Sequence, residues 1–473
     1  MLWLALRIPD LPLAVFERAA SSKAPFAVAD GRTVLLANAA ADAAGVLPGL
    51  PLSAAQALAP ELRFRQRQPA REEHALRRLA DWAFAYSPLV SLQPPSGLLL
   101  EIGGSLKLYE GLDKLLAGFR SGLQDLGYNG RLAVAPTPSA AWLLNLGGDE
   151  KPVIRHEELP ARLGLLPVAA LALAPTTLKA AQGLGIKDLN GLLALPRAGL
   201  ARRLGRELAT LLDRALGRVP DPRRPYLPKP RFESELELPA ETESATALAF
   251  PLRRLLLELG GFLLGLDSGV QQLHVVLEHA QPPATAFTLG LAAPGRAPDH
   301  LLALARERLD RVKLPAPVRA LRLQAPQIHP YTPDAPSLFQ DTASATNVWT
   351  QLIERLSARM GDSAVFGLGM VSEHRPERAW RYVSPGEPSA TEPPPERPLW
   401  LLPRPERLSC SHGQPHWHGP LVLRRGPERI ESGWWDGHDV RRDYYVAQNP
   451  RGERVWVFQE QRSRDWFLHG LFS

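Results

Sequence analysis

Residues 86–104, YSPLVSLQPPSGLLLEIGG, are the stretch of sequence that decides the fold. Leu98, Leu99 and Leu100 form a short apolar run that ends in Glu101, a pattern typical of a buried strand. The overlapping stretch EEHALRRLADWAFAY (residues 72–86) places apolar residues at helical spacing, and RTVLLAN (residues 32–38) predicts a further strand. Strands and helices therefore alternate through the first 155 residues, which predicts an α+β domain.

Two segments of this region resemble the Y family of translesion DNA polymerases. LALRIPDLPLAVFE (residues 4–17) is similar to that family's opening strand and turn, and residues 86–104 are similar to the segment that carries its paired catalytic acids. Matched residue by residue, Ile8 stands at the metal-binding aspartate, and Ser96 and Gly97 stand at the Asp-Glu pair. Glu101 takes the place of a later, structural acid.

The resemblance implies a polymerase scaffold without its chemistry. Nucleotidyl transfer in this family needs two divalent ions held by carboxylates, and Ile8, Ser96 and Gly97 supply none. Asp10 matches a second, non-catalytic aspartate, and we expect it to act as a turn or capping residue. The sequence therefore predicts no catalytic residue, no metal site and no cofactor.

The positions that would hold a nucleoside triphosphate are replaced as well. By resemblance, Ala39 and Asp42 stand at the family's Tyr and Arg, and Thr137 and Pro138 stand at its Asn-Lys pair. An acid that faces phosphates is repulsive. The alternative is an active translesion polymerase with a metal site rebuilt from Asp10, Asp42 and Glu101.

The C-terminal third carries the most specific part of the resemblance. SEHRPERAW (residues 372–380), GPERIESGWWDGHDVRRDYYV (residues 426–446) and WFLHGLF (residues 466–472) resemble the tail of ImuB-type proteins, the polymerase-like subunits of a bacterial DNA-damage mutasome. This resemblance implies a non-catalytic hub in the SOS response and error-prone translesion synthesis. The implied partners are DNA, the β sliding clamp, an ImuA-type RecA-like protein and an error-prone C-family polymerase. A stand-alone DNA-binding module is a further alternative.

Composition agrees with several domains and a polyanionic partner. The chain has 473 residues, 45% of them hydrophobic, and a formal net charge of +6. Cys410 is the single cysteine, so the chain has no intramolecular disulfide framework, which suits a reducing cytoplasm. We expect no signal peptide, no membrane span and a cytoplasmic location.

Pattern and resemblance together divide the chain into parts. These are a palm and fingers-like domain (1–155), a helix-hairpin-helix thumb-like domain (156–218), a linker (219–231), a βαββαβ little-finger-like domain (232–328), a flexible clamp-binding segment (329–346), a helical segment (347–383), a Pro-rich linker (384–398) and a C-terminal partner-interaction region (399–473). The predicted fold class is α+β and multidomain, with a small β-rich unit at the C-terminal end.

Candidate DNA-binding residues lie in three of these parts. They are Gly183 and Gly185 in the thumb turn, Arg218, Arg223, Arg224, Lys229 and Arg231 in and beside the linker, and Arg253, Arg254, Arg319 and Arg322 in the little finger. The alternatives are a packing role for the thumb turn, a solvated linker, and arginines that are simply exposed.

The remaining candidates concern protein partners. Ser337, Leu338 and Phe339 resemble part of a clamp-binding peptide, although Ala335 and Pro336 depart from its first two positions. Within TNVWTQLIERLSARMG (residues 346–361), an apolar stripe is expected to cover either an intramolecular core or a partner. The C-terminal aromatics are candidates for partner contacts or for a small core: Trp434, Trp435, Tyr444, Tyr445, Trp466 and Phe467. Cys410, His412, His416 and His418 match no zinc-finger spacing, so no metal is expected there.

Overall fold

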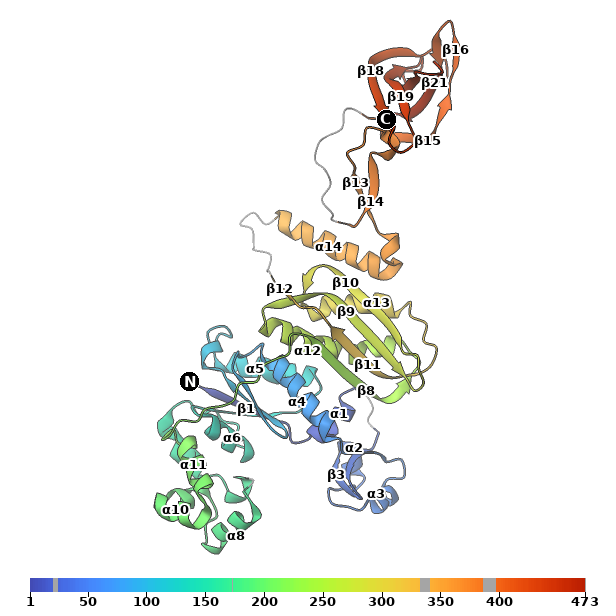
Figure 1. The fold of residues 1–473 in the computed structure, drawn as a ribbon. Helices are drawn as coiled ribbons and strands as arrows, with labels where there is room; N and C mark the ends of the chain where they lie inside the picture. The colour runs from blue at the N-terminus through green and yellow to red at the C-terminus, as the bar shows by residue number, and fades with distance from the viewer. Residues whose placement is uncertain (20–23, 172, 332–340, 386–396, 473) are drawn as a thin grey trace. The chain divides into compact units, whose positions relative to one another are not determined.

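The computed structural model describes residues 1–19, 24–171, 173–331, 341–385 and 397–472 (Figure 1). They form two compact units, Met1–Arg359 and Met360–Ser473. Among the described residues, no helix is long and apolar enough to cross a membrane.

A four-stranded antiparallel sheet in the order β5-β6-β1-β7 forms the centre of the palm. Its strands are β1 (Trp3–Arg7), β5 (Val90–Gln93), β6 (Gly97–Glu101) and β7 (Arg131–Ala135). Leu4 and Leu6 face the core under helices α4 (Pro69–Ala83) and α5 (Leu112–Asp125). Trp3 and Ala5 face the opposite core, under α6 (Pro138–Leu146). Both faces are covered, which is why Leu98–Leu100 is apolar throughout.

The fingers form a smaller module beside the palm. Helix α1 (Leu11–Glu17) follows β1, and the sheet order is β3-β2-β4. The elements are β2 (Phe26–Asp30), β3 (Thr33–Ala37), β4 (Arg63–Gln66), α2 (Ala39–Ala43) and α3 (Leu52–Leu58). The strand predicted over residues 32–38 is confirmed by β3.

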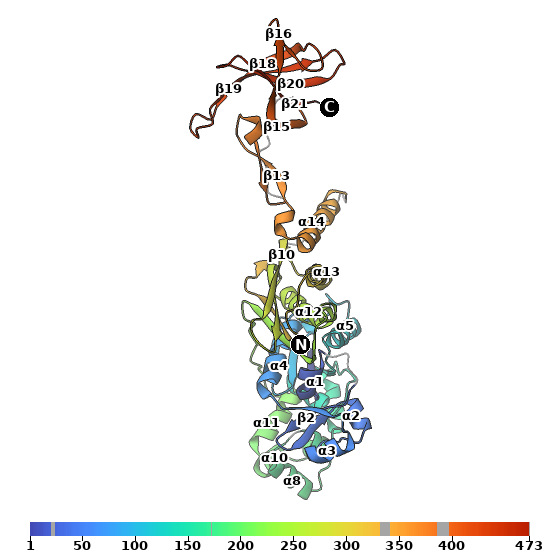
Figure 2. The same cartoon turned by 90° about the vertical axis from the view of Figure 1, so that its right-hand side faces the viewer.

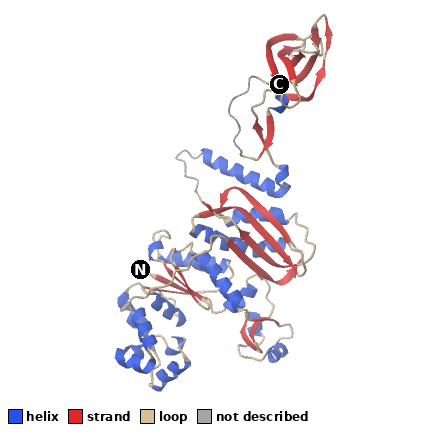
Figure 3. Ribbon diagram, in the orientation of Figure 1, coloured by secondary structure: helices blue, strands red, loops and turns tan. Residues whose placement is uncertain are grey.

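The thumb is built from helices alone in the described part of residues 156–218, as Figure 3 shows in blue. The α-helices are α7 (Leu159–Gly164), α8 (Pro175–Gly183), α9 (Leu189–Leu193), α10 (Arg197–Leu204) and α11 (Arg206–Ala215). Their apolar faces share one core with α6, so the thumb packs on the palm.

The little finger has the predicted strand, helix, strand, strand, helix, strand order. Its elements are β8 (Phe232–Thr242), α12 (Ala249–Gly265), β9 (Ser268–His279), β10 (Thr285–Gly295), α13 (Pro298–Leu309) and β11 (Val318–Ala325), followed by the short β12 (His329–Pro330). The sheet order is β10-β9-β11-β8, and α12 and α13 cover one face of it (Figure 2). The alternation of Leu273, Val275 and Leu277 marks that buried face.

Helix α12 packs the little finger against α4 of the palm. Gly261 and Gly265 allow this approach, because a Cβ at either position would clash with Trp82 or Phe84. Arg18 and Glu258 form an ion pair within the contact and are 6% and 1% exposed. The Ser234 hydroxyl also donates to Glu258 at 2.6 Å. The first unit is therefore joined across domains by a buried charge pair.

Helix α14 (Asp341–Met360) follows, and it overlaps the segment predicted to be flexible over 329–346. Glu354 attaches the helix to the little finger, because its carboxylate accepts from the Ala292 amide at 2.8 Å and contacts His300 at 2.6 Å. Trp349, Leu352 and Leu356 of the predicted stripe are exposed. The clamp-binding candidates Ser337, Leu338 and Phe339 lie outside the described residues.

The helical prediction for residues 347–383 is wrong beyond Met360. Residues 367–383 form a hairpin of β13 (Gly367–Met370) and β14 (Trp380–Val383). Leu368 pairs with Tyr382 and Met370 pairs with Trp380 across the hairpin, and their side chains are exposed. Alternation of apolar residues with Gly367 and Gly369 has the period of a strand.

The β-rich C-terminal prediction is confirmed. The main sheet has the order β15-β21-β20-β19-β18, and β16 and β17 form a separate hairpin. The strands are β15 (Trp400–Arg407), β16 (Ser409–Ser411), β17 (Gln414–His416), β18 (Val422–Ser432), β19 (Val440–Gln448), β20 (Arg454–Glu460) and β21 (Trp466–Leu471).

Candidate nucleic-acid interface

The three positions matched to the catalytic acids meet at one end of the palm sheet. Arg7 pairs with Gly97 in the antiparallel register, and the Ile8 amide donates to the Ser96 carbonyl at 2.8 Å. Ile8 is fully buried in the core under α4 and α5. The fold thus brings together the residues of the expected centre, and none of them carries a carboxylate.

An indole ring occupies the space beside Gly97. A Cβ at this position would clash with the ring of Trp142 on α6 and would lie 2.9 Å from the Leu6 carbonyl oxygen. An acidic side chain at residue 97 therefore requires Trp142 to move.

The surviving acids have separate environments. Asp10 occupies the position before α1, but its side chain makes no capping hydrogen bond, so only the turn part of that prediction holds. Burial raises the pKa of the Asp10 carboxyl, which lines a cavity of about 300 Å³ with Tyr128 and Asn129. Glu101 accepts from the amides of Leu2 and Gly103 at 3.1 Å, which confirms its structural role.

The residues matched to the triphosphate contacts lie in the first turns of helices α2 and α6 or cap them. Ala39 and Asp42 lie in α2, whose first turn is capped by Asn38. The Thr137 hydroxyl accepts from the Ala140 amide and donates to the Ala215 carbonyl at 2.8 Å, which joins α6 to the end of α11. Pro138 begins α6.

The linker itself fills the amino-terminal end of α6. The Ser139 amide donates to Asp221 at 2.8 Å, and the Arg223 guanidinium donates to both Asp221 and the Ser139 hydroxyl. A helix start favours anions, and here the anion is a carboxylate of the same chain. Arg223 is thus an internal anchor, and a DNA contact by this residue stays a prediction.

The linker is also held farther along its length. The Tyr226 amide donates to the Val90 carbonyl at 2.7 Å, and the Tyr226 hydroxyl donates to Asp81 at 3.0 Å. Arg224, Lys229 and Arg231 point outward and are exposed. Arg218 is exposed and lies 3.6 Å from Asp213. The linker therefore offers cations along a backbone that is fixed to the palm.

The thumb turn uses its amides internally. Gly185 adopts a φ of +75° after α8, and its amide donates to the Gln182 carbonyl at 2.9 Å. Gly183 is the last residue of α8. This geometry closes a helix and supports the packing alternative for the turn.

All four little-finger arginines contact other groups of the protein. Arg322 on β11 pairs with Glu278 at 2.6 Å and with Glu235 at 3.2 Å. Arg254 stacks on Phe250 and packs against Gly127 of the palm, and burial lowers its pKa. Acids or the palm occupy both guanidinium groups, so the structure lends no support to DNA contacts by Arg254 and Arg322, which stay a prediction. Arg319 is exposed, 3.6 Å from Glu278, and Arg253 lies 3.5 Å from Asp125.

The C-terminal aromatics divide into surface and core. Trp434 and Trp435 are 78% and 58% exposed, whereas Tyr444 and Trp466 are 1% and 7% exposed. Tyr445 and Phe467 pack against the two cores of the sheet. Partner binding by Tyr444 and Trp466 is therefore contradicted, since both rings fill the domain interior.

An arginine that was not among the sequence candidates holds the loop that carries the exposed tryptophans. Arg375, in SEHRPERAW, donates to Glu373 at 2.7 Å and to Asp436 at 2.8 and 3.0 Å. Its guanidinium also lies over the Trp435 ring, 5.6 Å from the centroid. The hydrogen bonds to Arg375 lower the pKa of Glu373 to about 2. Arg375 of residues 372–380 thus binds Asp436 of residues 426–446 and joins the two tail motifs. The opposite charges of these two residues were the available signal in the sequence.

The histidine loop gives no cation site in the part of the chain that the structure covers, where no group of three potential ligands is found. Ser409 pairs with His416 and Cys410 pairs with Pro415, so Cys410 and His416 are not cross-strand partners.

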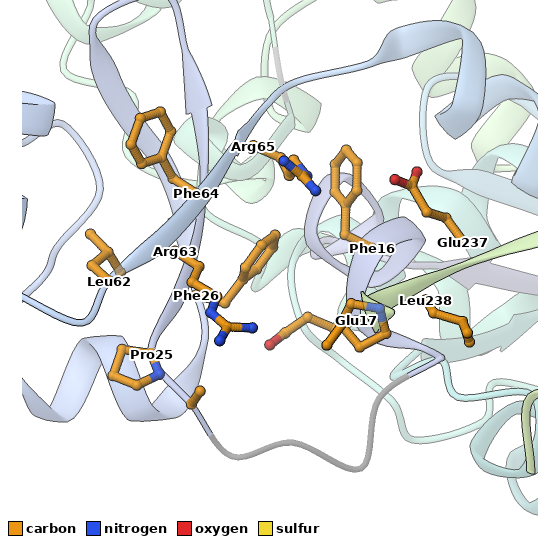
Figure 4. Close-up of a pocket in the computed structure, with 13 residues that line it drawn as sticks. Phe16, Glu17, Pro25, Phe26, Leu62, Arg63, Phe64, Arg65, Glu237 and Leu238 are labelled. Atoms are coloured by element: carbon orange, nitrogen blue, oxygen red, sulfur yellow. The ribbon is translucent and has the colours of Figure 1, made fainter. Parts of the chain in front are cut away.

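A cavity of about 440 Å³ lies between the fingers, α1 and β8 (Figure 4). Phe16, Phe26 and Phe64 line it with Arg63 and Glu237. It contains none of the residues matched to the catalytic acids.

Comparisons with known proteins show which proteins this chain resembles. Residues 12–145 match the impB/mucB/samB family model. Proteins titled "Protein ImuB" from two strains of Caulobacter vibrioides are 30% identical over 463 residues, covering 91% of this chain and 100% of each relative. Similar solved structures include a Y-family DNA polymerase chimera of Dbh and Dpo4 (17% identity, TM-score 0.40, 69% of this chain and 99% of that chain). DinB from Sulfolobus solfataricus is another, with 17% identity and a TM-score of 0.39, over 70% of this chain and 100% of that chain.

Proposed function

The chain belongs to the ImuB family of Y-family polymerase homologues, and from this we propose that it is a non-catalytic scaffold for error-prone translesion synthesis. It binds DNA and brings polymerase-mutasome partners to the damaged site, while another subunit performs the nucleotidyl transfer.

One observation carries the proposal: buried Ile8 is hydrogen-bonded to Ser96 beside Gly97, with Trp142 packed over the glycine. A two-metal centre needs carboxylates at this place. The Glu101 carboxylate accepts from backbone amides, and Asp10, whose side chain makes no capping hydrogen bond, is matched to a non-catalytic aspartate. This supports a retained scaffold over a rebuilt metal site.

DNA binding is supported by the positive net charge and by the exposed Arg224, Lys229 and Arg231 of the docked linker. Cations along a rigid backbone release counterions without a large ordering cost. Arg218 extends the same row at its amino-terminal end.

Partner binding follows the family resemblance. Ser337, Leu338 and Phe339 engage the β sliding clamp, and Trp434 and Trp435 contact an ImuA-type RecA-like protein or an error-prone C-family polymerase. Exposed tryptophans on a loop held by Arg375 suit a protein contact, because little side-chain freedom is lost on binding. The protein would act in the cytoplasm, under SOS control.

The scaffold function is tested by separating its two binding activities. Leu338→Ala/Phe339→Ala should abolish clamp binding in surface plasmon resonance and leave DNA anisotropy unchanged. The matched control is Leu352→Ala/Leu356→Ala, on the exposed face of α14. Unchanged clamp affinity in the first variant would remove the clamp from the proposal, and an absence of DNA binding by the wild-type protein would overturn the scaffold itself.

A further inference from the structure

Two arginines lie side by side at the end of the palm sheet where the catalytic acids are missing. Arg7 on β1 is directly opposite Arg131 on β7, and Gly97 is its neighbour on the other side. Side chains alternate along a strand, so Arg7 shares the face of Trp3 and Ala5, beneath α6. Arg7 is half-buried, and Arg131 is exposed.

Neither guanidinium group has an ion-pair or hydrogen-bond partner within the described ranges. Burial, and secondarily the charge of Arg131, lowers the pKa of Arg7. Like charges opposite each other on neighbouring strands destabilise a sheet. The pair therefore costs stability as long as no anion is bound.

Other buried or half-buried arginines of the palm and linker are matched with acids. Arg18 pairs with Glu258, Arg78 with Asp81 at 2.9 Å, and Arg223 with Asp221 at 2.9 Å. The contrast shows that the fold supplies carboxylates to such arginines elsewhere and leaves this pair without one.

We propose that Arg7 and Arg131 together bind a phosphodiester group of the DNA backbone, at the end of the palm sheet where Ile8, Ser96 and Gly97 lie. The inference rests on the proposed DNA-binding function and deepens it. Guanidinium groups suit this ligand, since their planar donors match phosphate oxygens and their charge needs no metal. The contact is therefore independent of Mg²⁺.

The test is fluorescence anisotropy of the full chain on primer–template DNA in EDTA, at several salt concentrations. Arg7→Gln/Arg131→Gln should lower the affinity about tenfold at 0.1 M salt and reduce the salt slope by about 1. Arg7→Lys/Arg131→Lys should keep most of the slope. Arg355→Gln, an exposed arginine on α14 that pairs with Glu307, is the control and should bind as wild type does.

Thermal melting without DNA provides the second readout. The Gln variant should melt at or above the wild-type temperature, because removing the pair removes repulsion. Unchanged DNA affinity and slope would overturn the inference, and so would a lowered melting temperature, which would mean that the pair stabilises the fold. If dATP or inorganic phosphate raised the melting temperature of the wild type and displaced DNA at equal concentration, the ligand of the two arginines would be a free phosphate. This result would overturn the proposed contact with the DNA backbone. Wild-type protein that binds no DNA would instead refute the proposed function.

Discussion

Trp142 on α6 packs directly over Gly97, so the indole ring fills the space that an acidic side chain at residue 97 would need. Residue 97 is matched to a catalytic acid of the Y-family polymerases. An acidic side chain at residue 97 and the indole ring in its present position therefore exclude each other.

Restoring the acid should damage the fold. Gly97→Glu must displace Trp142 and places a Cβ near the Leu6 carbonyl, so we expect the free energy of unfolding to fall by about 1–3 kcal/mol. Chemical denaturation measures this change. Gly118→Glu on α5 is the matched control, since a Cβ there meets nothing within 4 Å. Equal stability of the two variants would contradict the packing described for Trp142.

The stability of the packing between the palm and the little finger should depend on the ion pair of Arg18 and Glu258. Arg18→Met leaves Glu258 buried beside Ser234 without its cation, and we expect a loss of about 3–5 kcal/mol. Arg18→Met/Glu258→Met should recover much of that loss, because no unpaired charge remains. Denaturation of the two single variants and the double variant gives the coupling energy, and additive effects would show that the pair is not formed.

Stability should depend on pH through Asp81. Burial, opposed by the charge of Arg78, raises the pKa of Asp81 from 3.8 to about 6. The folded protein then holds this proton more tightly than the unfolded chain does. Protonated Asp81 therefore contributes its full share to the free energy of unfolding below pH 4, and this contribution is lost as the pH rises through 6. The loss amounts to about 3 kcal/mol. Asp81→Asn should remove this fall between pH 4 and 6 in denaturant titrations, and an unchanged pH profile would contradict it.

DNA affinity should depend on the linker more than on β11. Arg224→Gln/Lys229→Gln/Arg231→Gln should reduce the salt slope of DNA binding by about 2 to 3, roughly one for each phosphate contact. Arg319→Gln/Arg322→Gln should change it little, since Arg322 already pairs with Glu235 and Glu278. The reverse ranking of the two variants would place the DNA on the little-finger sheet.

Local patterns in the sequence predicted much of the fold. The run Leu98–Leu100 and the alternation of Leu273, Val275 and Leu277 identify strands because burial alone sets their pattern. The resemblance matched Ile8, Ser96 and Gly97 to the catalytic acids, and the structure brings these three residues together at one end of the palm sheet. The hairpin at 367–383 was missed, although Leu368 and Met370 alternate with glycines, because its strands are short.

The fate of individual arginines could not be predicted in the same way. Arg322 is neutralised by Glu235, which lies far away in the sequence, and Arg223 is anchored by Ser139. Such partners depend on strand order and on the docking of the linker. Likewise, Tyr444 and Trp434 look equivalent in the sequence, and only the packing of the sheet separates a core ring from an exposed one.

Primer extension by highly purified protein, with Mg²⁺ or Mn²⁺ and with DNA binding followed on the same sample, tests the central claim most directly. The account predicts binding of primer–template DNA without extension, both for the wild type and for an Asp10→Ala variant. Extension by the wild type that disappears in Asp10→Ala or Glu101→Ala would contradict it, because those acids would then form a working metal site.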